Sequence, residues 1–339
     1  MKILKIYGIA FLALFLSSSV IFMPNLFLSS QEQDVPVYSK SSAREIARVL
    51  KEKGILHFSL PFRVLAKLTR ADRKLKAGLY RLSPRMSLWG ILTTLSSGKT
   101  QLLLLKIPEG YTTEQIAQQL EKMNVVSGVE FLHAAQNREL LKKLGIMGPS
   151  AEGYLFPETY CVPLGAGADA LVELMVRQFD SYIGDDFEQR CRELGLSPYQ
   201  MVVLASIIEK EAKIDSERPI VAGVLYNRLH KKMRLQVNAT LNYVLTTKRA
   251  WLTNEQLGTQ SPYNTYLHRG LPPTPICNPG LESLEAAIHP ADTPYLYYVA
   301  QGDGSSLFAT TIEEHQKNVR EAKTIRRAKK RRLQAAGQN

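Results

Sequence analysis

The chain has 339 residues, 45% of them hydrophobic, and a formal net charge of +12. A chain of this length can form two or three domains with real cores, and its composition is that of a globular protein. No internal repeat is visible in the sequence, which excludes a solenoid or another repeat architecture.

The N-terminus predicts a membrane anchor over residues 1–29. Lys2 and Lys5 precede an uncharged, mostly apolar run from Ile6 to Met23, which is long enough to cross a bilayer. The positive-inside bias places both lysines in the cytoplasm, so we expect a single-pass protein of the bacterial inner (plasma) membrane with the rest of the chain outside. This orientation argues against nucleic acid as a partner. Cleavage of the segment as a signal peptide, at one of two serine clusters, stays open.

Residues 30–36 are polar, contain one proline and show no periodicity, and they predict a linker. A small α+β module is expected over residues 37–105, and it contains no catalytic constellation. Its expected elements are helices at 43–50 and 62–69, a strand at 76–82, a helix from Ser87 to Gly98 and a strand at 102–107.

Residues 106–322 predict a larger, mainly helical domain. Its segment 152–160 is rich in aromatic and acidic residues around Gly and Pro, and we interpret it as a loop or short-strand surface. Residues 233–280 are turn-rich, and their Tyr and Asn content favours a functional segment over a disordered one. The expected helices lie at 112–120, 127–145, 167–182, 185–194, 197–211 and from 216 onward.

The last part of the chain predicts a β-hairpin, with strands at 295–300 and 307–310 around a Gly-Asp-Gly turn. A final helix begins near Thr311 and leads into a basic tail at 323–339, which we interpret as solvated. Nucleic acid, a polyanionic envelope or a lipid surface would each attract this tail. The predicted fold class is α+β: an N-terminal transmembrane helix, a small α+β module and a larger, mainly helical domain with a short β-hairpin.

The helix that starts at Ser197 is the most informative of these elements. Ser197 suits the N-cap, Pro198 suits the first helical position, and Gln200 can return a hydrogen bond to the cap. Glu209 is expected on the flank of this helix. Glu211 falls within its apolar stripe, together with Met201, Leu204, Ile207 and Ile208.

A carboxyl group among aliphatic side chains resists ionisation, so its pKa rises and it can donate a proton near neutral pH. Glu211 is therefore a candidate general acid for the cleavage of a glycosidic bond. The alternative is structural, because an acid at helical spacing with aliphatic residues is more often an ion-paired residue at the edge of a core.

A site for a sugar polymer also needs hydrogen-bonding amides and aromatic faces. Alone, a loop amide is more often a turn former and a tyrosine is more often a packing residue, so only the set favours a glycan site. Residues 233–266 offer such a set in Gln236, Asn238, Tyr263, Asn264 and Tyr266.

Other classes of site lack their residues. The six histidines are isolated, whereas a zinc hydrolase would need pairs at helical spacing. No Gly-x-Ser-x-Gly motif and no phosphate-binding glycine loop occurs. The sequence predicts neither a metal nor a cofactor. The three cysteines, Cys161, Cys191 and Cys277, leave at least one thiol unpaired, and one disulfide stays open.

A set of collinear motifs runs along the chain: Lys76–Leu82, Pro108–Gly110, Glu152–Tyr160, Leu204–Glu211, Asn227–Leu229, Met233–Gln236, Tyr263–Tyr266, Gly270–Pro273, Asn278–Gly280, Ala291–Tyr297 and Glu314-His315. As a set these motifs are very specific. Nearly all of the chain beyond the anchor resembles the YceG-like family of endolytic murein transglycosylases.

The resemblance implies an enzyme that cuts the MurNAc–GlcNAc β-1,4 bond of peptidoglycan glycan strands internally and leaves a 1,6-anhydroMurNAc end, acting in cell wall assembly. It implies that the module at 37–105 is similar to LysM glycan-binding domains and that Glu211 is the catalytic acid. The expected partners are glycan strands and the inner membrane, with peptidoglycan synthases or divisome proteins as further candidates. Gln236 and Asn264 are expected to bind sugar or to position Glu211. The cleft wall is expected to include Tyr154, Glu158, Tyr226 and Tyr263.

The sequence departs from the family pattern after Gln236. Family members commonly have Gln-Ser/Thr-Asp-Pro-Thr, and this chain has Asn238 at the place of the Asp. Asn238 can still hydrogen-bond a sugar or hold the turn, but it cannot act as an ionised acid. Two alternative functions stay open: a membrane-tethered glycan-binding scaffold without catalysis, and a muramidase that uses water.

Overall fold

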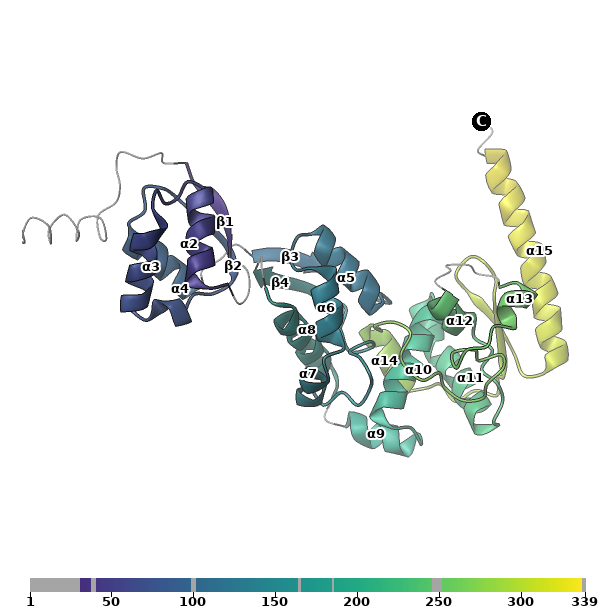
Figure 1. Cartoon of the computed structure of the whole chain (residues 1–339). Coiled ribbons are helices and arrows are strands. Elements are labelled where there is room, and N and C mark those ends of the chain that lie inside the picture. Colours follow the sequence, from purple (N-terminus) through teal and green to yellow (C-terminus); the bar gives the residue numbers. More distant parts are fainter. Residues whose placement is uncertain are drawn as a thin grey trace, which may run out of the picture. The chain divides into compact units, whose positions relative to one another are not determined.

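The computed structural model of the chain describes residues 31–37, 41–98, 102–163, 166–184, 186–245 and 252–336. Over these residues the fold is mainly helical α+β with three two-stranded sheets, which confirms the predicted α+β class (Figure 1). No helix in the described ranges is long and apolar enough to cross a membrane, and the anchor predicted at 1–29 lies outside them.

Tertiary contacts divide the chain into two compact units. The first comprises the described residues of Met1–Lys106, Ala117–Phe131 and Thr159–Leu171, and the second comprises the described residues elsewhere.

The first unit begins with a small module, residues 31–98, in which two strands and three helices share one core (Figure 1). The strands pair antiparallel, with Val35 opposite Tyr80. All the buried residues of this core lie between Val35 and Leu95, and the largest fully buried side chains include Tyr80 and Phe62. The elements are β1 (Gln33–Val37), α2 (Ala43–Glu52), α3 (Ser59–Leu68), β2 (Gly78–Leu82) and α4 (Leu88–Ser97).

Local signals set the helix ends of the module, as the sequence predicts. Ser42 and Glu45 form a capping box at the start of α2. Ser87 caps α4, and Gly98 ends this helix in the left-handed conformation, with φ 75°.

Two boundaries differ from the expected ones. The predicted linker at 30–36 contains most of β1, because Val35 and Val37 bury their side chains against the module core. Pro36 is tolerated there since a two-stranded sheet leaves each strand an unpaired edge. The strand β3 (Leu102–Lys106), which was expected to belong to the module, does not pair with a strand of the module. Its partner is β4 (Thr159–Pro163), in antiparallel register.

Two further predictions for the middle of the chain are wrong in detail. The single helix expected at 127–145 is broken, because the Asn137 side chain accepts hydrogen bonds from Glu139 N and Leu140 N and so caps a new helix. Segment 152–160 is not mainly a surface, since Leu155 and Phe156 are buried. The helices here are α5 (Thr113–Lys122), α6 (Gly128–Ala135), α7 (Arg138–Lys143), α8 (Ala168–Tyr182) and α9 (Phe187–Glu193).

The second unit is built around α10 (Pro198–Glu211), which other helices cover on several sides (Figure 1). Every residue of α10 from Met201 to Ile208 is buried. A helix that is buried all round is a core helix rather than an amphipathic surface helix. The neighbours in contact with it are α9, α11 (Arg218–His230), α12 (Asn238–Leu245) and α14 (Leu281–Ile288).

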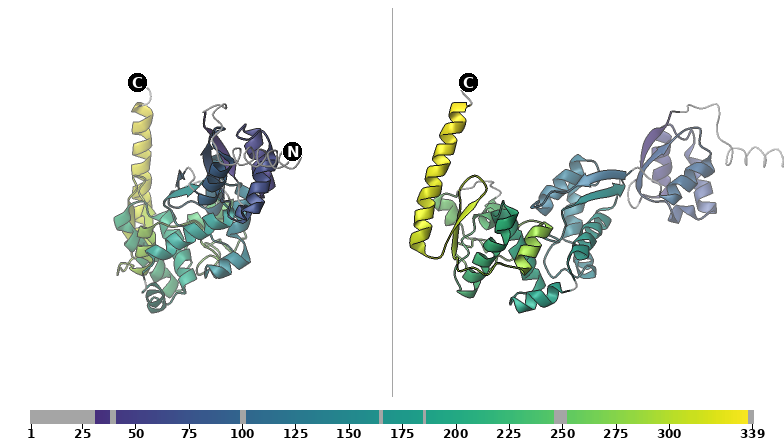
Figure 2. Two further views of the ribbon diagram at one scale, coloured as in Figure 1. Left: turned by 90° about the vertical axis from the view of Figure 1, so that its left-hand side faces the viewer. Right: turned by 180° about the vertical axis from the view of Figure 1, so that it is seen from behind.

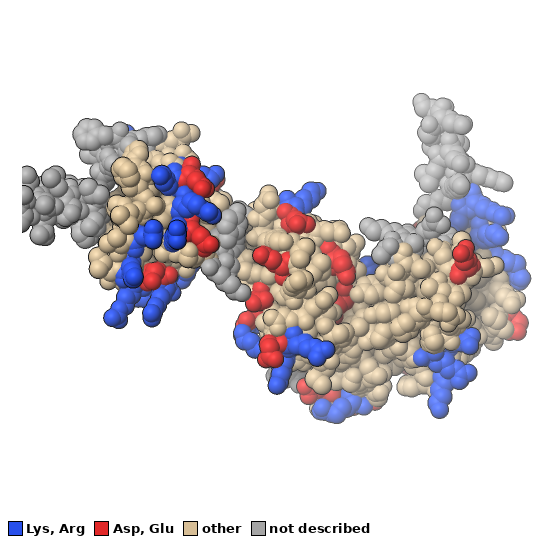
Figure 3. Space-filling model, viewed as in Figure 1, with Lys and Arg blue, Asp and Glu red and all other residues tan. Residues whose placement is uncertain are grey.

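The hairpin and the last helix complete this unit. Strand β5 (Tyr297–Ala300) pairs with β6 (Ser306–Ala309), as predicted. Helix α15 (Ile312–Ala336) contacts both strands and continues beyond them (Figure 2). The basic tail expected from residue 323 thus begins within a continuous helix, along which Lys and Arg side chains gather in Figure 3.

Candidate active site

Helix α10 starts as its sequence predicts. Ser197 Oγ accepts a hydrogen bond from Gln200 N at 3.2 Å, and Gln200 Oε1 accepts one from Ser197 N at 2.9 Å. Pro198 occupies the first turn, where its missing N–H leaves no unpaired donor. The helix ends at Glu211, because Ala212 is already in an extended conformation.

Glu211 is partly exposed at this helix end, and its carboxyl group contacts two other elements. Tyr298 Oη, on β5, donates a hydrogen bond to Glu211 Oε2 at 3.0 Å. The backbone of Ala239, on α12, donates another. Burial raises the pKa of Glu211 above its ordinary value, and the bonds from Tyr298 and Ala239 offset part of this rise. The raised pKa fits a group that holds a proton to be donated.

The segment that carries Tyr298 is held by two neighbouring side chains of α11. Asn227 Nδ2 donates to the carbonyl groups of Thr293 and Tyr295, at 2.7 and 3.0 Å. Buried Arg228 donates to the carbonyl groups of Leu296 and Leu235, at 2.6 and 2.8 Å. Arg228 and Tyr298 are functional candidates that sequence reasoning missed. The Asn227–Leu229 motif was a signal for the first, whereas Tyr298 lies among several similar tyrosines.

Gln236 lies on the loop that leads into α12, and Asn238 is the first residue of this helix, next to the loop that carries Tyr266. Gln236 is exposed and has φ 55°, a left-handed conformation that non-glycine residues rarely adopt and that often marks functional loops. Tyr266 Oη donates to Asn238 Oδ1 at 2.6 Å. Burial raises the pKa of Tyr266, and its interaction with Glu211 raises this pKa further, so the ring lies near the carboxyl group. The structure therefore brings Tyr266 and Asn238 to the surroundings of Glu211.

Asn264 and Tyr263 have structural partners. Asn264 is fully buried, and its amide binds the carbonyl groups of Leu257 and Thr259 and the N–H of Tyr266. Direct sugar binding by Asn264 is therefore not supported, and it instead shapes the loop that places Tyr266. Tyr263 Oη lies 2.7 Å from Thr274 Oγ1.

The other three residues expected in the cleft wall lie elsewhere in this unit. Tyr226 is 5% exposed and donates to Ala287 O, so it belongs to the core and the prediction of a wall residue is wrong. Tyr154 packs its ring 5.0 Å from that of Phe179. Glu158 is partly exposed and accepts a hydrogen bond from Tyr182 Oη at 3.1 Å.

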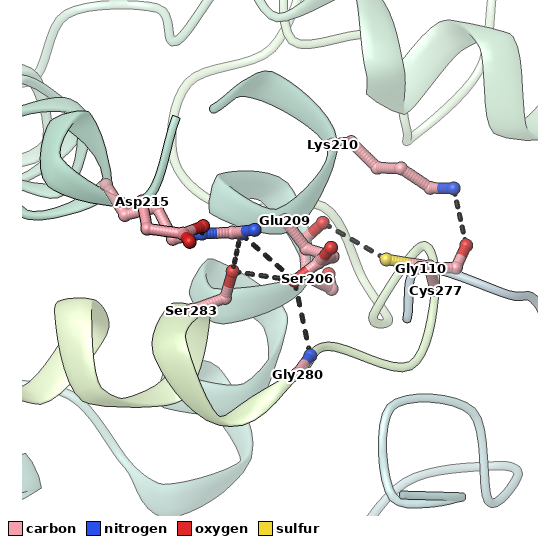
Figure 4. A network of polar contacts seen from close by, with 9 residues as sticks. Gly110, Ser206, Glu209, Lys210, Asp215, Cys277, Gly280 and Ser283 are labelled. Carbon is pink, nitrogen blue, oxygen red and sulfur yellow. Dashed lines mark hydrogen bonds and ion pairs between the residues drawn. The ribbon is translucent and has the colours of Figure 1, made fainter. Parts of the chain in front are cut away.

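Glu209 is not on an open flank, which corrects the expectation from helical spacing. Its side chain is 8% exposed, and Glu209 Oε2 lies 3.1 Å from Arg218 Nη1. Ser283 Oγ and Gly280 N donate to the same oxygen, at 2.7 and 3.2 Å (Figure 4). The reason is that α14 covers this side of α10, and the acid there needs a cation and donors to be buried. The two acids of the motif thus differ in their partners: Glu209 pairs with Arg218, whereas Glu211 accepts a hydrogen bond from the hydroxyl group of Tyr298.

A second buried acid, Glu152, joins distant parts of the chain. It is 3% exposed and accepts hydrogen bonds from Thr113 N, Asn278 Nδ2 and Tyr243 Oη. Burial raises the pKa of Glu152 to about 8. Asn278 is fully buried, and its Oδ1 also accepts from Gly153 N and Leu155 N. These contacts give Glu152 and Asn278, one residue from each of two sequence motifs, a structural role: they connect segments that are distant in the sequence.

Metal-ligating groups, thiols and a pocket are the other features of the described ranges that bear on ligand binding. No group of three or more His, Cys, Asp or Glu there could hold a metal ion. All three cysteines are free thiols, with Cys191 and Cys277 buried and Cys161 exposed. A pocket of about 530 Å³ is lined by part of the loop between α13 (Asn254–Leu257) and α14: Gln260, Ser261, Pro262, His268, Arg269, Leu271 and Pro273.

The fold and the site define a mainly helical α+β protein with a partly exposed glutamate of raised pKa at the end of a core helix. The chain belongs to the YceG-like family, whose model matches residues 35–321.

Named relatives agree with this family. A protein of Bacillus subtilis (strain 168) named endolytic murein transglycosylase is 31% identical over 302 residues, which cover 84% of this chain and 83% of the relative. One of Streptococcus pneumoniae serotype 2 (strain D39) with the same name is 31% identical over 313 residues, which cover 83% of this chain but 56% of the relative. A crystal structure of a YceG-like protein from Listeria monocytogenes is 33% identical, with a TM-score of 0.58, and the match covers 85% of this chain and 99% of that chain.

Proposed function

We propose that this protein cleaves peptidoglycan glycan strands internally, at the MurNAc–GlcNAc β-1,4 bond, and leaves a 1,6-anhydroMurNAc end. The observation that supports this most is the state of Glu211. Its carboxyl group is partly exposed, contacts a hydroxyl group rather than a cation, and has a raised pKa. The relatives named endolytic murein transglycosylases supply the substrate class and the type of reaction.

In the proposed mechanism, Glu211 serves first as an acid and then as a base. The protonated carboxyl group gives its proton to the glycosidic oxygen, and the bond from this oxygen to C1 of MurNAc breaks. The 6-hydroxyl oxygen of the same MurNAc bonds to C1 and closes the anhydro ring, and its proton returns to Glu211. One carboxyl group suffices, since no water attacks, whereas most glycosidases need two acids. Tyr298 orients the carboxyl group, and Gln236 and Asn238 are the candidates to hydrogen-bond sugar.

We also propose that residues 1–29 anchor the protein in the inner membrane, with the site outside the cytoplasm. Peptidoglycan lies on that side, so an anchored enzyme would meet strands close to where they are made. Peptidoglycan synthases and divisome proteins are the candidate protein partners in this setting.

Digestion of purified sacculi, followed by mass spectrometry of the soluble fragments, tests the proposal. We expect fragments with anhydro ends from the unaltered protein and none from Glu211→Gln, which removes the proton donor but keeps a similar shape. The matched control is Glu255→Gln, the same change at an exposed position of α13, and it should digest sacculi like the unaltered protein.

Each other result contradicts a defined part of the proposal. Fragments with reducing ends would mean a muramidase that uses water. Binding to sacculi without any fragments would mean a scaffold. Substantial cleavage by a folded Glu211→Gln variant would overturn the assignment of the acid, and Glu209→Gln would then be the next variant to assay.

A further inference from the structure

The exposed face of α3 in the N-terminal module carries several large apolar side chains. Its inner face is formed by the buried residues Phe62, Leu65 and Ala66. A helix on the surface of a soluble module normally turns polar residues to water. The outer side instead presents large hydrophobic side chains with high exposed fractions: Phe58 74%, Leu60 63%, Val64 48% and Leu68 78%.

We call these side chains together the α3 stripe: Phe58, Leu60, Val64 and Leu68. The last three follow at intervals of four residues, so their side chains lie on one side of the helix. Single exposed apolar residues are normal on protein surfaces, but an uninterrupted row of them marks an interaction surface.

Basic residues border the stripe. Arg63 and Lys67 lie on the exposed side of α3, and this helix contains no acidic residue. The segment after it, residues 69–78, has one acid, Asp72, and four basic residues: Arg70, Arg73, Lys74 and Lys76. Figure 3 shows Lys and Arg side chains beside an uncharged area on this module. An apolar stripe with a cationic border is the composition of helices that lie in the interface of anionic membranes.

The chain also limits how far the module can be from a bilayer. The proposed anchor ends at residue 29, and β1 begins at Gln33. Four residues span at most about 14 Å when fully extended. The start of the module is therefore tethered within a short distance of the lipid headgroups.

We propose that the α3 stripe docks on the anionic lipid surface of the membrane, with aliphatic side chains in the headgroup layer and Arg63 and Lys67 on lipid phosphates. This inference rests on the proposed anchor and not on glycan cleavage. A sugar polymer fits the surface less well, because the stripe is mainly aliphatic and offers no hydrogen-bonding group of its own, whereas sugars need both amides and aromatic faces.

Spin labels on the full chain, reconstituted in vesicles of phosphatidylcholine with or without phosphatidylglycerol, test this docking. Labels are placed by Leu60→Cys, Val64→Cys and Leu68→Cys in a Cys161→Ser background, since the other two native thiols are buried. The matched control is Lys51→Cys, an exposed polar position of α2. Collision with oxygen, which concentrates in lipid, is compared with collision with a water-soluble nickel complex.

We expect a several-fold higher ratio of oxygen to nickel collisions at the three α3 positions than at Lys51→Cys, and only with phosphatidylglycerol present. With Arg63→Gln and Lys67→Gln added, the ratio at the three α3 positions should fall to that of the control even in vesicles with phosphatidylglycerol. Ratios equal to the control would overturn the proposal. Shielding of the labels from both reagents would also overturn it and would indicate a protein partner or a second copy. Extraction of the vesicles with carbonate tests the anchor separately from the docking. If the chain resists extraction while its α3 labels contact water, the proposed anchor stands and the proposed docking of the α3 stripe is wrong.

Discussion

At the scale of single residues, the two acids of the Glu-Lys-Glu motif differ by their partners rather than by their sequence context. Glu209 has Arg218, Ser283 and Gly280 around one oxygen, and these contacts give it a structural role. Glu211, one half-turn later at the helix end, has the hydroxyl group of Tyr298. Burial raises the pKa of that hydroxyl group well above its ordinary value, so Tyr298 remains a hydrogen-bond donor at any pH at which the enzyme would work.

Replacement of Tyr298 by Phe should change the pH profile of cleavage. The hydrogen bond from Tyr298 lowers the pKa of Glu211, so its removal leaves burial less opposed and raises this pKa further. The acid must be protonated at the start of the proposed reaction, and activity therefore falls as pH rises through its pKa. The alkaline limb of the rate profile on sacculi should move to higher pH in Tyr298→Phe. An unmoved limb would show that the hydroxyl group does not tune the acid.

Glu152 should make the folded state less stable as pH rises. Its pKa is about 8 in the folded state against an ordinary value of 4.5, so between these values the folded state holds a proton that the unfolded state has released. Rising pH then favours unfolding, by up to about 1.4 kcal/mol for each unit of pKa difference. Urea denaturation from pH 5 to 8 should show this fall in the unaltered protein and a flatter curve in Glu152→Gln. Equal slopes in the two proteins, and in the control Glu255→Gln, would contradict it.

At the scale of elements, local signals were sufficient for most helix and turn boundaries. The caps at Ser42, Ser87 and Ser197 depend on neighbours three residues away, so the sequence pattern shows them directly. The pairing of β3 with β4, which sets Leu105 opposite Tyr160, depends on a distant segment that no local pattern indicates.

The candidate site follows the same division. Glu211 is predictable because its spacing relates it to residues of its own helix. Its partner Tyr298 lies 87 residues further on, among tyrosines that the sequence does not distinguish. The burial of Glu209 depends on the layer formed by α14, which helical periodicity cannot indicate, and the same layer makes α10 a core helix instead of an amphipathic one.

The ion pair between Glu209 and Arg218 connects α10, α11 and α14, and its loss should destabilise the second unit. Arg218→Met leaves Glu209 buried without a cation, which costs about 3 kcal/mol or more in comparable cases. The matched control Arg234→Met changes an exposed arginine and should shift stability by less than about 0.5 kcal/mol. Urea denaturation measures both, and similar small shifts for the two variants would argue that the pair is not needed.

At the scale of the whole molecule, the core of the N-terminal module draws, among the residues that the structure describes, only on buried residues between Val35 and Leu95. We therefore expect a fragment of residues 31–98 to fold alone. Its thermal unfolding, followed by circular dichroism, should be cooperative, and its amide signals in NMR should be dispersed. A fragment without dispersed signals would show that the module depends on the rest of the chain. Small domains of this size are only marginally stable, so a low melting temperature is expected.

The hydrogen bonds of Asn278 affect how the second unit folds. Its Nδ2 donates to Tyr111 O across a sequence separation of 167 residues, and its Oδ1 binds the N–H groups of Gly153 and Leu155. Contacts so distant along the chain cost more loop-closure entropy than local ones and slow folding. During synthesis, Gly153 and Leu155 therefore lack this hydrogen-bond partner until Asn278 has been added to the chain. In this unit, a residue of the last third of the chain thus completes the hydrogen bonds of segments near Tyr111 and Glu152.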